Sequence, residues 1–182
     1  MTALDTLKQI QGLIGVVQDG QFGPKSRAAL ANLLTADPAA AWPPTPGAHS
    51  VLASNFADPA DYRAFLTCKA LGKSDEECFQ IGDNCIGLWG DPTGEGTGPK
   101  CALPPEDWRE HWGSGDAARH AKVLVTRSQS DGSTLRVVCL LDDTMPEKTN
   151  ITNGAGIDLN PDACAALHLQ PPVLTRVTWK WA

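Results

Sequence analysis

Asp143-Thr144-Met145-Pro146, followed by Gly154-Ala155-Gly156-Ile157-Asp158-Leu159-Asn160-Pro161, is the part of the chain that decides the fold. The segment Leu135 to Leu141 just before it is β-branched and aliphatic, so it predicts a buried strand with Asp143 emerging at its end. Asp158 comes shortly before a predicted helix, which Asn160 caps and Pro161 opens. Carboxylates at a strand end and before a helix can converge on one groove. Such a pair suits work on a sugar chain.

The order of these segments resembles a known family. A strand, Asp-x-x-Pro, a glycine turn, Ile-Asp-Leu, a short helix and a closing strand follow one another as in the double-psi β-barrel of rare lipoprotein A and the expansins. Upstream, Ala53 to Phe56 and Ala102 to Pro104 resemble the first and second barrel strands of those proteins. The resemblance covers most of Val51 to Ala182. It implies a mainly-β, six-stranded double-psi β-barrel with helical insertions.

The N-terminal part of the chain carries a separate signal. Apolar residues between Leu4 and Ile14 follow helical spacing, and Pro24 opens a second predicted helix. The turn between them, Asp19-Gly20-Gln21-Phe22-Gly23-Pro24, resembles that of the small three-helix peptidoglycan-binding module. Its glycines permit backbone conformations closed to other residues, and Phe22 can anchor the turn. We predict a small all-α module over residues 1–36 and, by the resemblance, count Asp19 and Phe22 among its substrate-binding residues.

A stretch rich in proline and alanine, residues 37–50, follows this module and is typical of a semi-stiff tether. The barrel domain is then expected over residues 51–182. A chain of 182 residues fits either one medium domain or a small domain plus a medium one, and this stretch marks the boundary of the second arrangement. The prediction is therefore a binding module tethered to a barrel.

The net charge of the chain disfavours some classes of binding partner. The formal net charge is -6, the sequence pI is near 5.1, and no run of Lys or Arg occurs. Nucleic acid and anionic membrane surfaces are therefore poor partners, and no apolar stretch approaches the length of a membrane span. The N-terminus lacks the order of a secretory signal. We expect a monomer that acts on peptidoglycan or a related polysaccharide in the periplasm, the cell wall or the medium. The sequence does not identify its route there.

The chain has six cysteines, an even number that favours disulfides in an oxidising compartment. We predict a Cys68–Cys78 bond across a turn between two helices that begin at Asp58-Pro59 and at Ser74, and a Cys85–Cys101 bond. Cys139, in a strand, and Cys164, in a helix, are predicted to be small buried hydrophobes. No spacing resembles a zinc site, and we expect neither a metal nor another cofactor.

The resemblance also assigns roles to acidic residues. Asp143 matches the catalytic aspartate of rare lipoprotein A through Asp-x-x-Pro, and Asp158 matches that of the expansins and barrel endoglucanases through Ile-Asp-Leu. Asp58 occupies a position like the catalytic base of those endoglucanases, but it competes with a role as helix N-cap. Burial or a like charge would raise the pKa of one carboxyl and keep it protonated. Asp142, of opposite strand parity to Asp143, is predicted to be exposed.

Other side chains are candidates for substrate binding. Ser54 and Asn55 are predicted to line the groove, and Asn150 and Asn153 either satisfy backbone groups or reach an N-acetyl substituent. Trp89 lies in a glycine-rich loop over residues 81–99, where it either stacks on a sugar or plugs the loop onto the barrel. The tryptophans predicted to be core residues are Trp108, Trp112, Trp179 and Trp181.

Histidine is missing where rare lipoprotein A has one. That family carries a histidine just before its Leu-Pro pair, whereas Lys100-Cys101-Ala102-Leu103-Pro104 has none. His120 precedes a predicted strand, Lys122 to Thr126, and solvent is its expected neighbour. A lytic transglycosylase needs no base to activate water, so the absence affects that route less than hydrolysis.

Two functions are consistent with these patterns. The first is a wall-degrading enzyme of lytic transglycosylase or muramidase type, in which the N-terminal module holds the glycan strand and the barrel cuts it. The second is an expansin-like protein that binds and loosens the polymer without cleaving a bond. A tethered binding module raises local concentration at an insoluble substrate, which favours the enzyme.

Overall fold

The computed structural model describes residues 47–182. The predicted three-helix module over residues 1–36, with Asp19 and Phe22, lies outside the described residues, as does most of the tether. Among the described residues, no helix combines the length and the apolar character that a membrane crossing requires.

Six strands form a closed barrel in the order β1-β5-β2-β4-β3-β6. Two neighbouring pairs, β1 with β5 and β2 with β4, are parallel, and the others are antiparallel. The strands are β1 (His49–Asn55), β2 (Lys100–Leu103), β3 (Lys122–Ser128), β4 (Thr134–Thr144), β5 (Ala155–Leu159) and β6 (Thr175–Trp181). The prediction of a mainly-β, six-stranded barrel is confirmed. The first strand begins within the stretch assigned to the tether.

Alternate residues of the strands fill the barrel interior. β5 shows the pattern at its end, because Ile157 and Leu159 are buried in the main core while Asp158 between them is half-buried. Burial of a Leu, Ile or Val side chain stabilises a fold by about 1.5–3 kcal/mol. The largest fully buried apolar side chains are Leu103, Val123, Val125, Leu141, Ile157, Leu159, Leu167, Val177 and Trp179. This core holds the strands in register and fixes what their outer faces present.

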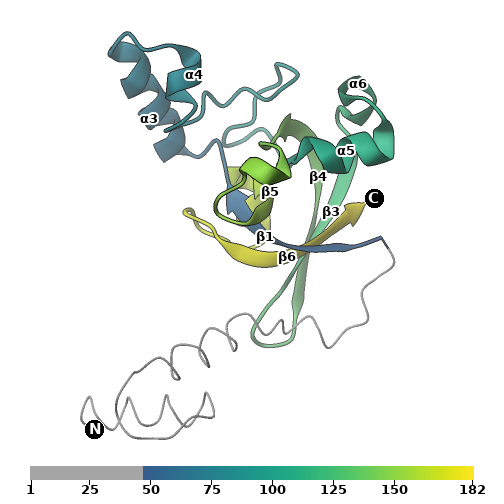
Figure 1. Ribbon diagram of the computed structural model, residues 1–182. Coiled ribbons are helices and arrows are strands. Elements are labelled where there is room, and N and C mark those ends of the chain that lie inside the picture. Colours follow the sequence, from purple (N-terminus) through teal and green to yellow (C-terminus); the bar gives the residue numbers. More distant parts are fainter. Residues whose placement is uncertain (1–46) are drawn as a thin grey trace, which may run out of the picture. The chain divides into compact units, whose positions relative to one another are not determined.

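Helices connect the strands, and α3, α4 and α7 begin where the sequence predicts caps. They are α3 (Pro59–Ala70), α4 (Asp75–Cys78), α5 (Pro105–Trp112), α6 (Gly115–Ala118) and α7 (Pro161–Ala166), with a 3-10 turn η2 (Lys148–Asn150). Asp58 caps α3, and Asn160 caps α7 by accepting from the Ala163 amide at 3.0 Å. In Figure 1, α3 and α4 project from one side of the barrel, while α5 and α6 lie on another.

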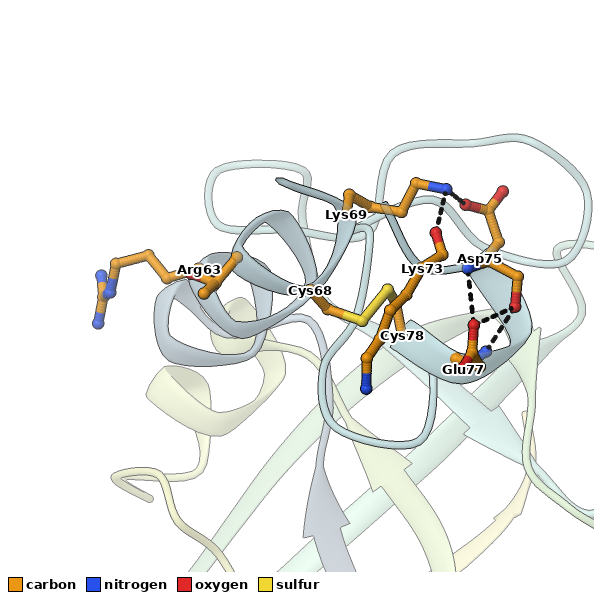
Figure 2. The surroundings of a disulfide bond; sticks show 9 residues. Arg63, Cys68, Lys69, Lys73, Asp75, Glu77 and Cys78 are labelled. Atoms are coloured by element: carbon orange, nitrogen blue, oxygen red, sulfur yellow. Dashed lines mark hydrogen bonds and ion pairs between the residues drawn. A yellow bond between two sulfur atoms is a disulfide. The ribbon is translucent and has the colours of Figure 1, made fainter. Parts of the chain in front are cut away.

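The α3–α4 insertion is closed by a disulfide. Cys68 and Cys78 are bonded, with Cα atoms 5.5 Å apart, as predicted. Figure 2 shows this bond close to Glu77 of α4. Glu77 and Ser74 form a capping box, in which each side chain accepts a hydrogen bond from the other residue's backbone amide. In the same view, Lys69 reaches the Asp75 carboxylate at 2.6 Å.

Some of the other predictions for cysteine and tryptophan are confirmed, and others are wrong. Cys85 and Cys101 are free thiols, so the predicted bond between them is wrong. The reason is that Cys101 points into the barrel core, whereas Cys85 packs outside it against the Ala57 carbonyl. Cys139 and Cys164 are buried as predicted.

Trp108 and Trp179 are core residues, and Trp181 packs against the core from its margin. Trp112 is 40% exposed, so its predicted burial is wrong. It lies in the last turn of α5, where its ring meets Trp181 edge-on at 5.9 Å instead of entering the core.

Candidate functional site

Asp143 and Asp158 belong to one row of residues across the outer face of the barrel. Ser54 pairs with Asp158 between β1 and β5, and Ala102 in β2 pairs with Asp158 on one side and with Asp143 on the other. Paired residues on neighbouring strands present their side chains to the same face. The residues that precede them in β1, β2 and β5 are fully buried in the main core: Ala53, Cys101 and Ile157. The row therefore faces outward.

The spacing within this row suits a pair of cooperating carboxyls. Two strand separations of about 4.8 Å put the Cα atoms of Asp143 and Asp158 about 10 Å apart. Only the methyl group of Ala102 stands between the two side chains in the row. A smaller apolar cluster surrounds that methyl group and consists of Phe56, Ala57, Ala102, Met145 and Ala155, with Cys85 and Ile151 packed against it. The carboxyls are thus set among apolar side chains.

Of the two carboxyls, Asp143 has the larger pKa shift. The pKa of its carboxyl is raised from 3.8 to about 7, mainly by burial and to a lesser extent by the nearby Asp83 and Asp158 carboxylates. Hydrogen bonds from the backbone amides of Thr144 and Leu88 act in the opposite direction. The Thr144 amide donates to Asp143 Oδ1 at 2.8 Å. A carboxyl with this pKa can be protonated at mildly acidic pH and give its proton to a substrate.

Asp158 is perturbed less because a hydroxyl supports its charged form. Its pKa is raised to about 6, mainly by burial, and the hydrogen bond that Ser54 Oγ donates to Asp158 Oδ1 opposes this rise. The Asp61 and Asp83 carboxylates contribute smaller parts of the rise. Ser54 was predicted as a substrate-binding residue, and here it contacts the second carboxyl directly. The two aspartates thus have different environments within one row.

Asp61 and Asp83 are neighbours of this pair that the sequence gives no reason to single out. The Asp83 amide donates to the Asp61 carbonyl at 3.2 Å, which holds the loop after α4 against α3. Gly82 makes this approach possible, because a Cβ there would lie 2.4 Å from the same carbonyl oxygen. Burial raises the pKa of both carboxyls. Asp83 also forms a short local turn, in which its Oδ1 accepts a hydrogen bond from the Cys85 amide at 2.6 Å. Such a turn does not by itself point to a functional site.

Asp58 and Asn55 use their polar atoms within the protein. Asp58 Oδ1 accepts from the amides of Ala60 at 2.6 Å and Asp61 at 3.1 Å, and its Oδ2 accepts from Asn55 Nδ2 at 2.8 Å. Asn55 Oδ1 in turn accepts from the Val173 amide at 2.6 Å. The cap role predicted for Asp58 is confirmed by these contacts.

β4 contains a bulge next to Asp143, and this bulge changes the direction of the Asp142 side chain. Cys101 pairs with Leu141, yet Ala102 pairs with Asp143, so Asp142 is an extra residue in β4. A bulge of this kind breaks the strict alternation of a strand. Asp142 is 1% exposed, and the prediction that it is exposed is wrong. Its carboxylate contacts the Lys100 ammonium group and, at 2.9 Å, His120 Nε2.

Asp91, His120 and Asp142 are the one trio among the described residues whose ligand atoms lie close enough for a metal ion, within 4.8 Å of one another. His120 Nε2 lies 2.9 Å from Asp91 Oδ2, and Arg119 donates to the same oxygen at 2.8 Å. Cations already accompany both carboxylates, because Lys100 pairs with Asp142 and Arg119 with Asp91. The contacts are those of an ion-pair cluster. His120 therefore faces two carboxylates as well as solvent.

The remaining candidates lie in loops. Trp89 is partly buried and packs against the main core, with its ring 3.8 Å from the site a Cβ on Gly115 would occupy. Asn153 Oδ1 accepts from the Ala155 amide at 3.0 Å, so it satisfies a backbone group as one alternative proposed. Asn150 is exposed at the end of η2. Roles of these three residues in substrate binding stay predictions.

Comparison with known proteins adds no relative: neither a family model nor a curated protein matches this chain.

Proposed function

We propose that this protein binds peptidoglycan and that its barrel, of the double-psi type found in rare lipoprotein A and the expansins, cleaves the glycan strand. The closed order of mixed strands, with parallel pairs β1–β5 and β2–β4, supports this fold type. The row that runs from Ser54 to Asp143 across these pairs is the proposed active site. The N-terminal module would hold the polymer, and a periplasmic, wall or secreted location follows from that substrate.

One observation carries the proposal: two partly buried carboxyls, both with a raised pKa, share one outward row on either side of an alanine. Buried carboxyls of this kind are costly to a fold, because the charged form is poorly solvated. Perturbed carboxyls cluster at sites of acid and base catalysis. Glycosidic bonds are cleaved by such carboxyls, which protonate the leaving oxygen.

In the proposed transglycosylase reaction, Asp143 acts first as acid and then as base. Its proton moves to the glycosidic oxygen as the bond from that oxygen to the sugar C1 breaks. The resulting Asp143 carboxylate then takes the proton of the same sugar's C6 hydroxyl, whose oxygen bonds to C1 and closes an anhydro ring. Asp143 ends protonated, as it began. Asp158, held towards its charged form by Ser54, stabilises the positive charge that develops at C1.

Hydrolysis is the second route by which the same pair cleaves the strand. In inverting enzymes the acid and the base lie about 6.5–9.5 Å apart so that a water molecule fits between the base and the sugar. The roughly 10 Å between the Cα atoms of Asp143 and Asp158 is compatible with that range once the side chains extend. Asp158 would then be the base. Asp58, the other candidate base, already accepts three hydrogen bonds.

The alternative function is expansin-like loosening of the polymer without cleavage. It is favoured by the absence of a histidine in Lys100 to Pro104 and by the internal contacts of Asp58. An expansin-like protein would use the same row to bind the glycan. The two functions differ in whether covalent products form.

The test is to incubate the full-length protein with purified sacculi at pH 5 to 8 and analyse soluble products by mass spectrometry. Anhydro-muropeptides identify a transglycosylase, and new reducing ends identify a hydrolase. Binding in a sedimentation assay without soluble products, even at high protein load, would refute cleavage and support the expansin-like function. Deleting residues 1–34 should weaken sedimentation with sacculi. Unchanged binding would refute the role given to the N-terminal module.

A further inference from the structure

A short hairpin in the loop before β2 lies directly against the β4 bulge. Ile86 and Pro92 form an isolated antiparallel bridge, and the Thr93 amide donates to the Cys85 carbonyl at 2.9 Å. Near its tip, the Leu88 amide donates to the Asp142 carbonyl at 3.1 Å. The approach is tight, because a Cβ on Gly87 would lie 2.1 Å from that carbonyl oxygen. The hairpin over residues 85–93 therefore covers the backbone next to Asp143.

Side chains hold the same hairpin from its other strand. Asp91 Oδ2 meets His120 Nε2 at 2.9 Å and Arg119 at 2.8 Å, and these contacts lower the pKa of Asp91. His120 also meets Asp142 Oδ1 at 2.9 Å. A single imidazole thus bridges the hairpin and the bulge residue. Lys100, from β2, neutralises the buried Asp142 carboxylate on its other side.

The backbone of His120 has an uncommon conformation beside this bridge. Its φ is +59°, in the left-handed region that residues other than glycine seldom occupy. The His120 amide donates to the Leu141 carbonyl at 2.9 Å, one residue before Asp142. Such strain persists only where surrounding contacts enforce it, and it is common at functional positions. The contact with Leu141 and the bridge to Asp142 fix His120 to the bulge.

We propose that His120 and Asp91 are positioning residues: with Asp142 they clamp the 85–93 hairpin onto the β4 bulge and thereby keep the Asp143 carboxyl partly buried. The charged groups that face Asp143 are Asp83 and Asp158, and its hydrogen bonds come from the backbone amides of Thr144 and Leu88. Release of the hairpin would admit water to Asp143 and remove the Leu88 contact. The clamp itself follows from geometry, whereas its importance for turnover rests on the proposed function.

The test uses full-length protein carrying Asp91→Asn, which removes the hairpin's charge at a half-exposed position. The matched control is Asp131→Asn, an exposed aspartate in the β3–β4 turn with its own local hydrogen bonds to Ser133. Hydrogen exchange at the Leu88 amide should accelerate about fivefold in Asp91→Asn, the factor expected for one exposed ion pair, and stay unchanged in the control.

A second variant moves the hairpin without altering charge. Gly87→Ala forces its Cβ into the Asp142 carbonyl, so the hairpin must shift and Leu88 exchange should also accelerate. Because burial is the largest cause of the raised pKa of Asp143, both variants should lower that pKa, measured by carbon-13 titration of the carboxyl. The upper pH limit of sacculus cleavage should fall with it. His120→Gln, which keeps a donor, should lie between wild type and Asp91→Asn.

The outcomes separate the clamp from the proposed function. Unchanged Leu88 exchange in Asp91→Asn, or faster exchange with an unmoved Asp143 titration, would overturn the clamp. Tight zinc(II) binding to the wild-type protein that Asp91→Asn abolishes would also overturn it, in favour of a metal site. Faster exchange with a lowered Asp143 pKa, but no soluble products from any variant, would sustain the clamp and refute cleavage.

Discussion

Asp142 and Asp143 are neighbours in one strand, yet their carboxyls have opposite surroundings. Asp142 is 1% exposed and lies between Lys100 and His120, while Asp143 faces the outer row with two further carboxyls near it and no basic group among the causes of its shift. The bulge in β4 makes this division possible, because it turns one residue out of the alternating pattern. One aspartate is thus tied into the fold, and the other is left available for chemistry.

The largest expected effect comes from Asp143→Asn. If Asp143 is the acid, its loss should reduce the release of soluble fragments from sacculi by about 10²–10⁴-fold, the usual contribution of a positioned acid. Mass spectrometry of digests measures this, and sedimentation with sacculi should be unaffected. Asp158→Asn should also impair release. Full release by both variants would show that the row is not the active site.

Asp142→Asn should lower the stability of the fold, because Asp142 is the aspartate that has a structural role. It leaves the Lys100 ammonium group buried without its partner, which typically costs about 3–5 kcal/mol. Urea unfolding followed by tryptophan fluorescence measures this loss. Replacing both partners, Lys100→Met with Asp142→Leu, should recover much of the stability. A single variant as stable as wild type would contradict the structural role given to Asp142.

The raised pKa of Asp143 predicts how the stability of the fold depends on pH. Its folded pKa of about 7 exceeds the ordinary 3.8, so the folded state binds the proton more tightly than the unfolded chain. The resulting stabilisation is complete below pH 3.8 and is lost as the pH rises to about 7. Relative to Asp143→Asn, the wild type should lose up to about 4 kcal/mol over this range.

Chemical denaturation at a series of pH values tests this prediction. Asp131→Asn serves as a control of opposite sign, because hydrogen bonds from Ser133 lower the pKa of Asp131. For that residue the stabilisation should appear as the pH rises through the acidic range. Parallel curves for wild type and Asp143→Asn would contradict the raised pKa.

The smallest effect is expected away from both aspartates, in the α3–α4 insertion. The Cys68–Cys78 bond spans a sequence separation of 10, for which loop-closure entropy predicts about 3 kcal/mol or less. Replacing both cysteines by serine should destabilise the insertion while the barrel unfolds at nearly the same denaturant concentration. Hydrogen exchange resolved by segment measures the difference. An equal acceleration in β4 would show that insertion and barrel unfold together.

Local signals in the sequence predicted much of the fold. The capping residues Asp58, Ser74 and Asn160 each begin a helix, and the β-branched run before Asp143 is a strand. The Cys68–Cys78 bond follows from its position between two such helices. These features depend on residues only a few positions apart. The closed barrel, in contrast, was expected from resemblance to a family.

Features set by distant contacts were missed. Strand parity assigned Asp142 to solvent, because a bulge leaves no mark in the alternation of residue types. Asp91, His120 and Asp142 are far apart in the sequence but form one cluster in the fold. No sequence motif predicts this cluster. The pairing of Cys85 with Cys101 failed for the same reason, since facing inward or outward depends on the barrel register.

The closure of the barrel has a consequence for how this protein would behave on a surface. A sheet with free edges offers unpaired backbone groups to strands of other molecules, which is a common start of aggregation. Within residues 47–182, every strand has a neighbour on both sides. If the protein acts on an insoluble polymer as proposed, copies crowded along it would find no free edge in this barrel to extend.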